Sequence, residues 1–157
     1  MAEETINENT GEIVVANKSE APVFKLDENT TGVVRTTVNM NTFEGRMSVF
    51  DATQNALPLE EHLNEDIELA NITMQGVQIN DRENGGTIPG TRTILMASNG
   101  TAYTTVSDSV KNAVFTLFSI AGMPDKWPNP ITVKVLRVKG NNGYSFYKFV
   151  PQFKKTK

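Results

Sequence analysis

Apolar and polar positions alternate along most of the chain after residue 32. This period of two predicts β-strands, because successive strand side chains face opposite sides of a sheet. Clusters of Asn, Gly and Pro, which turns and hairpins select, separate the alternating segments. The predicted strands are 33–40, 45–52, 67–79, 91–97, 101–106, 131–139 and 144–153. The pattern therefore predicts a mostly β domain.

One segment, residues 107–122, has a helical period instead. Ser107 or Asp108 is available as N-cap and Gly122 as C-cap. Its apolar stripe consists of Val110, Ala113, Val114, Leu117, Phe118 and Ala121. We therefore expect an amphipathic helix of about four turns that packs on the sheet.

The predicted strand 67–79 changes its apolar phase twice, the second time at Gly76. Such phase changes indicate bulges that let one strand coil round a small barrel. Three strands, a helix and two further strands are the element order of an oligonucleotide/oligosaccharide-binding (OB) barrel. We expect an OB-fold-like, partly open, five-stranded antiparallel barrel with one α-helix, and the 91–106 segment as an extra hairpin. A flat sandwich is the alternative, although one helix covers a sandwich poorly.

Charge divides the chain of 157 residues into an acidic start and a basic end. Residues 1–20 hold five acidic residues against one lysine, whereas no acidic residue follows Asp125. We expect residues 1–21 to be a disordered acidic arm and residues 22–157 to be a single OB-like domain with a basic C-terminal tail. The basic end suits a polyanion as partner, and solvated lysines on outward strand faces are the alternative.

Composition excludes several kinds of chemistry. The chain has no cysteine, one histidine (His62) and no phosphate-binding GxxxxGK[ST] motif. The acidic cluster in residues 60–68 lies in one connector, whereas metal nucleases need carboxylates converging from rigid elements. We expect no catalytic residue, no metal and no cofactor. A carboxylate-metal nuclease that uses Glu65 or Asp66 is a third candidate function, behind the two given below.

No apolar run approaches the roughly 20 residues that a membrane span needs, and MAEETINENTGE lacks the features of a signal peptide. We expect an intracellular protein with no membrane partner.

Aromatic residues beside polar ones are the candidate binding groups. Phe50 shares its predicted strand face with Arg46, and Tyr103 alternates with threonines. Such rings stack on bases in sequence-tolerant single-strand binders, while neighbouring cations contact phosphates. The last strand places Tyr144 and Phe146 on the face of Lys148, so we expect that face to open to solvent. The candidate nucleic-acid-binding residues are Phe50, Tyr103, Tyr144, Phe146, Arg35, Arg46, Arg92, Lys134, Arg137, Lys139 and Lys148.

Three stretches, NTFEGRMSVFDA, TILMASNGTAYTTVSDSVKNAV and ITVKVLRVKGNNGYSFYKFV, occur in that order between about residues 36 and 150. In these stretches the chain resembles the single-stranded-DNA-binding proteins of protein-primed Bacillus phages and their relatives. The resemblance implies a non-enzymatic OB protein that coats the displaced strand during phage DNA replication in the host cytoplasm. It also implies that Tyr103 stacks on bases.

We therefore expect a sequence-independent single-stranded DNA-binding protein. Phage replication proteins and further copies of the chain are additional candidate partners. The alternative function is a structural or replisome protein-interaction module that binds no nucleic acid.

Overall fold

The structure is a computed structural model that describes residues 34–153. The predicted acidic arm, residues 1–21, and the lysines at 154, 155 and 157 lie outside the described residues. Within them no helix is both long and apolar enough to cross a membrane.

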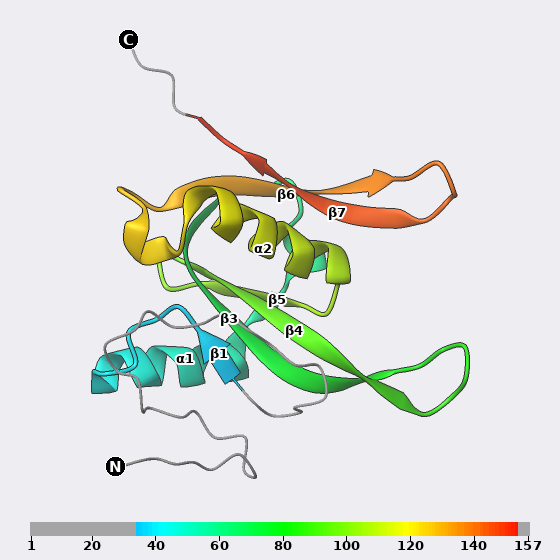
Figure 1. Ribbon diagram of the computed structural model, residues 1–157, viewed down its shortest axis with the longest axis horizontal. Coiled ribbons are helices and arrows are strands. Elements are labelled where there is room, and N and C mark those ends of the chain that lie inside the picture. Colours follow the sequence, from blue (N-terminus) through cyan, green and yellow to red (C-terminus); the bar gives the residue numbers. More distant parts are fainter. Residues whose placement is uncertain (1–33, 154–157) are drawn as a thin grey trace.

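The described residues form one seven-stranded sheet that curls into a half-barrel (Figure 1). Its strand order is β2-β5-β4-β3-β6-β7, with β1 paired to β3. All pairings are antiparallel except that of β2 with β5. The strands are β1 (Val34–Thr36), β2 (Leu57–Pro58), β3 (Ile67–Asn80), β4 (Thr87–Ala97), β5 (Ala102–Thr105), β6 (Ile131–Lys139) and β7 (Ser145–Pro151).

The strands β3, β4 and β5, a helix, and then β6 and β7 give the element order of an OB barrel. The predicted fold class, a mostly β, partly open OB-like barrel, is confirmed. The hairpin 91–106 differs from the expectation, because its two strands are central members of the sheet and not an extension. The strand predicted at 33–40 is shorter than expected. It ends at Thr36, where the chain turns and Thr37 N–H donates to Ile72 O.

The long strand β3 contains one register irregularity, between Leu69 and Asn71. It coincides with the first of the two predicted phase changes. At the second, Gly76 lies opposite Thr91 in continuous register, so the bulge expected there is absent. Met74 is the last residue of β3 in the main core, so the apolar phase beyond Gly76 is not fixed by packing in that core.

The predicted helix is confirmed as α2 (Asp108–Ala121). Ser107 is its N-cap, accepting a hydrogen bond from Val110 N–H, and Gly122 ends it with a φ of 82°. Val110 and Val114 are fully buried against the inner side of the curled sheet. This inner core joins α2 to β3, β4, β5 and β6, and Tyr147 and Phe149 of β7 pack against it.

The prediction of a strand at 45–52 is wrong, because these residues belong to helix α1 (Phe43–Asn55). Thr42 is the N-cap and accepts a hydrogen bond from Gly45 N–H. Val49 and Ala52, three residues apart, form the buried side of the helix. Ala52 packs with Ile94 and Ala102 on the outer face of β4 and β5. Two short 3-10 helices, η1 (Leu59–His62) and η2 (Pro124–Lys126), complete the fold.

Gly45 provides a test of how α1 is held. A Cβ added to this glycine would collide with the Asn39 carbonyl oxygen. We expect Gly45→Ala to lower the free energy of unfolding by about 1–3 kcal/mol through overpacking, although alanine is the better helix former. The measurement is thermal unfolding of this variant, with Gln54→Ala, at an exposed position of α1, as the control. An unchanged or higher melting temperature for Gly45→Ala would contradict the prediction.

Candidate nucleic-acid interface

Six of the eleven predicted site residues lie in the C-terminal hairpin made by β6, β7 and the turn between them. The register places Lys148 opposite Leu136 and Phe146 opposite Val138 on one face of this hairpin. The other face carries Tyr147 and Phe149, which pack against the core. The expectation that the Phe146/Lys148 face opens to solvent is therefore confirmed. The six residues are Lys134, Arg137, Lys139, Tyr144, Phe146 and Lys148.

Arg137 and Tyr147 form a fixed pair opposite one another in the hairpin. Arg137 Nη2 donates to the Tyr147 hydroxyl at 2.9 Å, and the guanidinium lies 5.4 Å from the centre of the same ring. The hydrogen bond to Tyr147 raises the pKa of Arg137 above its ordinary value. The pair holds a permanent cation at the surface beside an aromatic ring.

The three lysines of the hairpin differ in their surroundings. Lys134 Nζ lies 2.9 Å from the Asp66 carboxylate, so part of its charge is already neutralised. Lys139 and Lys148 are exposed, and neither forms an ion pair within residues 34–153. These two lysines are the better placed to contact a phosphate.

Tyr144 lies at the tip of the same hairpin and is 75% exposed. The turn beneath it is ordered by backbone hydrogen bonds, among them Gly140 N–H to Tyr144 O at 2.7 Å. Gly143 has a φ of 88°, a conformation that favours glycine. The ring is therefore presented on a defined turn.

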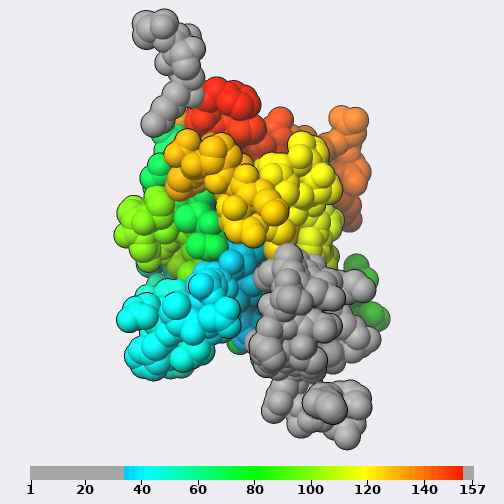
Figure 2. Space-filling view, turned by 60° about the vertical axis from the view of Figure 1, so that its left-hand side comes forward, coloured from blue at the N-terminus to red at the C-terminus, as the bar shows by residue number. Residues whose placement is uncertain are grey.

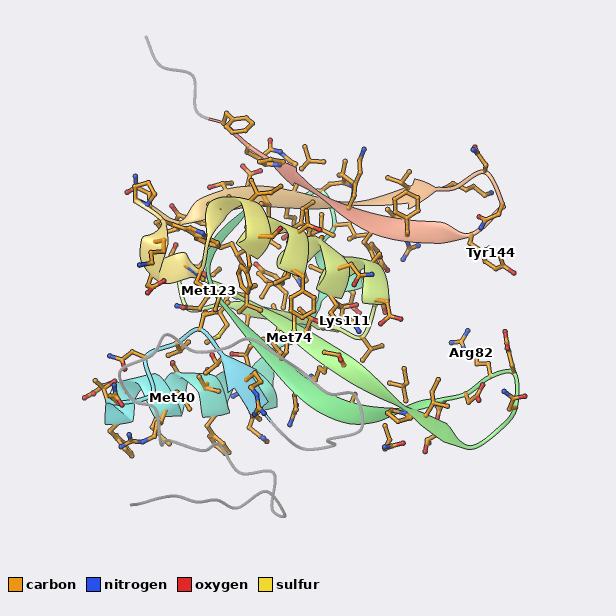
Figure 3. All side chains as sticks on the ribbon, viewed as in Figure 1. Met40, Met74, Arg82, Lys111, Met123 and Tyr144 are labelled. Atoms are coloured by element: carbon orange, nitrogen blue, oxygen red, sulfur yellow. The ribbon has the colours of Figure 1, made fainter. Side chains whose placement is uncertain are left out.

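The tip of the β3–β4 hairpin carries Arg82, a cation that is not among the site residues predicted from the sequence. Figure 1 shows both long hairpins extending to the same side of the molecule, and in Figure 3 the side chains of Arg82 and Tyr144 extend toward one another from the two tips. Hydrogen bonds from Asn84 and Glu83 lower the pKa of the neighbouring Asp81, whose carboxylate orders this turn. Arg82 lies in the turn between β3 and β4, and this turn position is the only signal for it in the sequence.

Phe50, Arg46 and Arg35 lie elsewhere. Phe50 and Arg46 are on α1, which is at the opposite end of the molecule from the C-terminal hairpin (Figures 1 and 2). Phe50 is 58% exposed and continues an apolar stripe with Phe43 and Met47. Arg46 Nη1 donates to Met40 O, which fixes the turn before α1. Phe50 and Arg46 form a second surface, separate from the hairpin, and Arg35 lies on β1 opposite Met74 of β3.

Arg92 is half-buried beneath α1 and serves the fold. Its Nε donates to Thr104 Oγ1 at 2.8 Å, and its Nη1 donates to Thr53 O at 3.0 Å and to Gln75 Oε1 at 3.1 Å. Burial lowers the pKa of Arg92 from its ordinary value. The side chain thus ties the last turn of α1 to β3 and β5, and its donors are directed at protein acceptors.

Tyr103 lies on the inner face of β5, not on the polar face expected from its threonine neighbours. It is 8% exposed and belongs to the main core, while Ala102 faces α1. The His62 ring of η1 meets the Tyr103 ring edge-on, with 5.2 Å between centres. Burial, and then the charge of Glu65, raise the pKa of Tyr103. Base stacking by Tyr103 stays a prediction, and it requires η1 or its neighbours to move.

The acidic cluster of residues 60–68, expected in one connector, is divided between η1, the segment after it and the start of β3, and three of its side chains have separate partners. Glu65 pairs with His62, Asp66 with Lys134, and Glu68 accepts a hydrogen bond from Ser98. Within the described part of the chain no group of three or more His, Asp or Glu side chains is arranged to hold a metal ion.

The sequence comparison decides the family. The family of phage single-stranded DNA-binding proteins matches residues 28–150. The chain belongs to this family. The match includes the three stretches in which the resemblance was found, and it extends from before β1 to Val150 in β7. No curated protein and no solved structure is significantly similar to the chain.

Tyr103 provides a test that separates packing from stacking in this single-stranded DNA-binding protein. We expect Tyr103→Ala to lower the free energy of unfolding by about 3 kcal/mol, because it removes a buried ring from the core. Tyr103→Phe should keep most of the stability. Urea denaturation of both variants measures this. A fully stable Tyr103→Ala variant with much weaker DNA binding would show instead that the ring stacks on bases.

Proposed function

We propose that the protein coats single-stranded DNA during phage DNA replication in the host cytoplasm, without sequence preference and without catalysis. The observation that carries the proposal is the composition of the C-terminal hairpin. Its exposed rings and cations lie on the two faces and at the tip of one strand pair, and β6 and β7 contain no acidic residue. Membership of the phage single-stranded DNA-binding protein family supports the same ligand.

The two kinds of side chain have complementary tasks. Tyr144 and Phe146 offer ring faces to bases, and stacking tolerates any sequence because every base has a π-face. Lys139, Lys148 and Arg137 attract the phosphates between the bases. Arg82 lies at the tip of the β3–β4 hairpin and would supply a further cation to the bound DNA.

The surface on α1 with Phe50 and Arg46 is a separate candidate contact in this proposal. It lies at the opposite end of the molecule from the hairpin (Figures 1 and 2), so it would contact a different part of a bound DNA strand. Its apolar stripe also suits a protein contact, so the two surfaces need separate tests.

Salt dependence tests the phosphate contacts. Binding to oligo(dT) should weaken as salt rises, because neutralised phosphates release their counterions. Lys148→Ala should reduce the slope of log K against log salt by about one. Fluorescence anisotropy across a salt series measures both, with Lys126→Ala, a cation of η2, as the control. A slope that is the same in all three proteins would remove Lys148 from the site.

Two exposed phenylalanines give a matched test of where bases stack. Phe146 is 44% exposed on β7, and Phe50 is 58% exposed on α1. We expect Phe146→Ala to weaken oligo(dT) binding by about 1–3 kcal/mol, the value of one stacked base. Phe50→Ala should change it by much less. Titration at one low salt concentration compares the two variants, and the reverse order of effects would move the stacking site to α1.

A further inference from the structure

A groove of about 540 Å³ lies between α2 and β7. Asn112, Thr116 and Ile120 of α2 line one side, and Phe146 and Lys148 of β7 line the other. Ile120 is 81% exposed, although isoleucine is among the residues most often buried. The groove is therefore an open apolar surface next to the proposed DNA-binding hairpin.

The chemistry of this groove suits a nucleobase. Its walls are largely apolar, and the hydroxyl of Thr116 and the amide of Asn112 stand among them. None of the described residues that line it is acidic, and Lys148 supplies a positive charge. A base has apolar faces and polar edges, and its backbone phosphate is negative, so all three of its features have a counterpart here.

The groove is continuous with the hairpin surface. Phe146 and Lys148 belong to both, and Ser109 Oγ in α2 accepts a hydrogen bond from Tyr147 N–H at 3.0 Å. That hydrogen bond fixes β7 against the start of α2. A single DNA strand with a base stacked on Phe146 would therefore continue along the side of α2.

We propose that the groove between α2 and β7 binds bases of the single-stranded DNA held by the C-terminal hairpin. This site extends the nucleic-acid path onto a helix face that carries none of the residues predicted from the sequence. The inference rests on the proposed function, because it requires that the hairpin binds DNA.

The test places a carboxylate inside or outside the groove on the same helix. Thr116→Glu puts the charge in the groove, and Ser119→Glu puts it at an exposed position of α2 that does not line the groove. Both variants change the net charge equally. The probe is labelled oligo(dT) of about 16 nucleotides, the upper end of the site size of one OB fold. Circular dichroism verifies that both variants fold.

We expect Thr116→Glu to raise the dissociation constant about tenfold and Ser119→Glu to raise it less than about threefold, at low salt. As a second measurement, photocrosslinking of the wild-type protein to bromodeoxyuridine-substituted oligonucleotide should yield a crosslinked peptide from α2.

Equal effects of the two substitutions, with crosslinks confined to the β6–β7 hairpin, would overturn the groove site while leaving the proposed function intact. A change of oligomeric state in Thr116→Glu without a specific loss of DNA affinity would assign the groove to a protein contact and also overturn it. Failure of the wild-type protein to bind oligo(dT) at low salt would overturn the proposed function itself.

Discussion

The strand β3 is paired along both edges, and the rest of the architecture depends on this pairing. One edge is occupied by β4 from Leu69 to Asn80. The other edge is shared in succession by β6, opposite Ile67 to Leu69, and β1, opposite Thr73 to Gln75. The register irregularity after Leu69 lies between these two partners. Because a bulge bends its strand and increases the local twist, one strand can serve both partners and curl the sheet into a half-barrel.

This sharing also explains why the proposed binding residues stand in exposed positions. Only the first three residues of β6 pair with β3, so the remainder of β6 pairs with β7 alone. The hairpin beyond Val133 thus leaves the main sheet, and its outer face lacks a covering layer among the described residues. Side chains such as Phe146 and Lys148 are exposed for this reason. α2 lies alongside β7 and forms the groove with it.

The elements with strong local signals were predictable, and those decided by tertiary contacts were not. Ser107 and Gly122 cap the two ends of α2, as expected, and residues 131–139 form the strand β6. Residues 45–52 alternate well enough for a strand, yet the Thr42 cap and the spacing of Val49 and Ala52 make them a helix. Tyr103 shows the same limit, because alternation finds two faces of a strand but not which one is core. With α1 covering the outer face, both faces of β5 carry buried residues.

The cations illustrate why a site is harder to derive from sequence than a fold. Arg92 and Lys134 count as positive charges in the sequence, yet the fold commits the first to three internal acceptors and the second to Asp66. The charge of Lys134 is already partly neutralised by Asp66, so it releases fewer counterions on binding DNA than an unpaired lysine. Arg92 keeps its charge, but its donors are directed at neutral protein acceptors. The number of phosphates that such a protein can neutralise therefore depends on which of its cations the fold leaves exposed at the surface. In this chain, that places the available charge on Lys139, Lys148 and Arg137 of one hairpin and on Arg82 of the other.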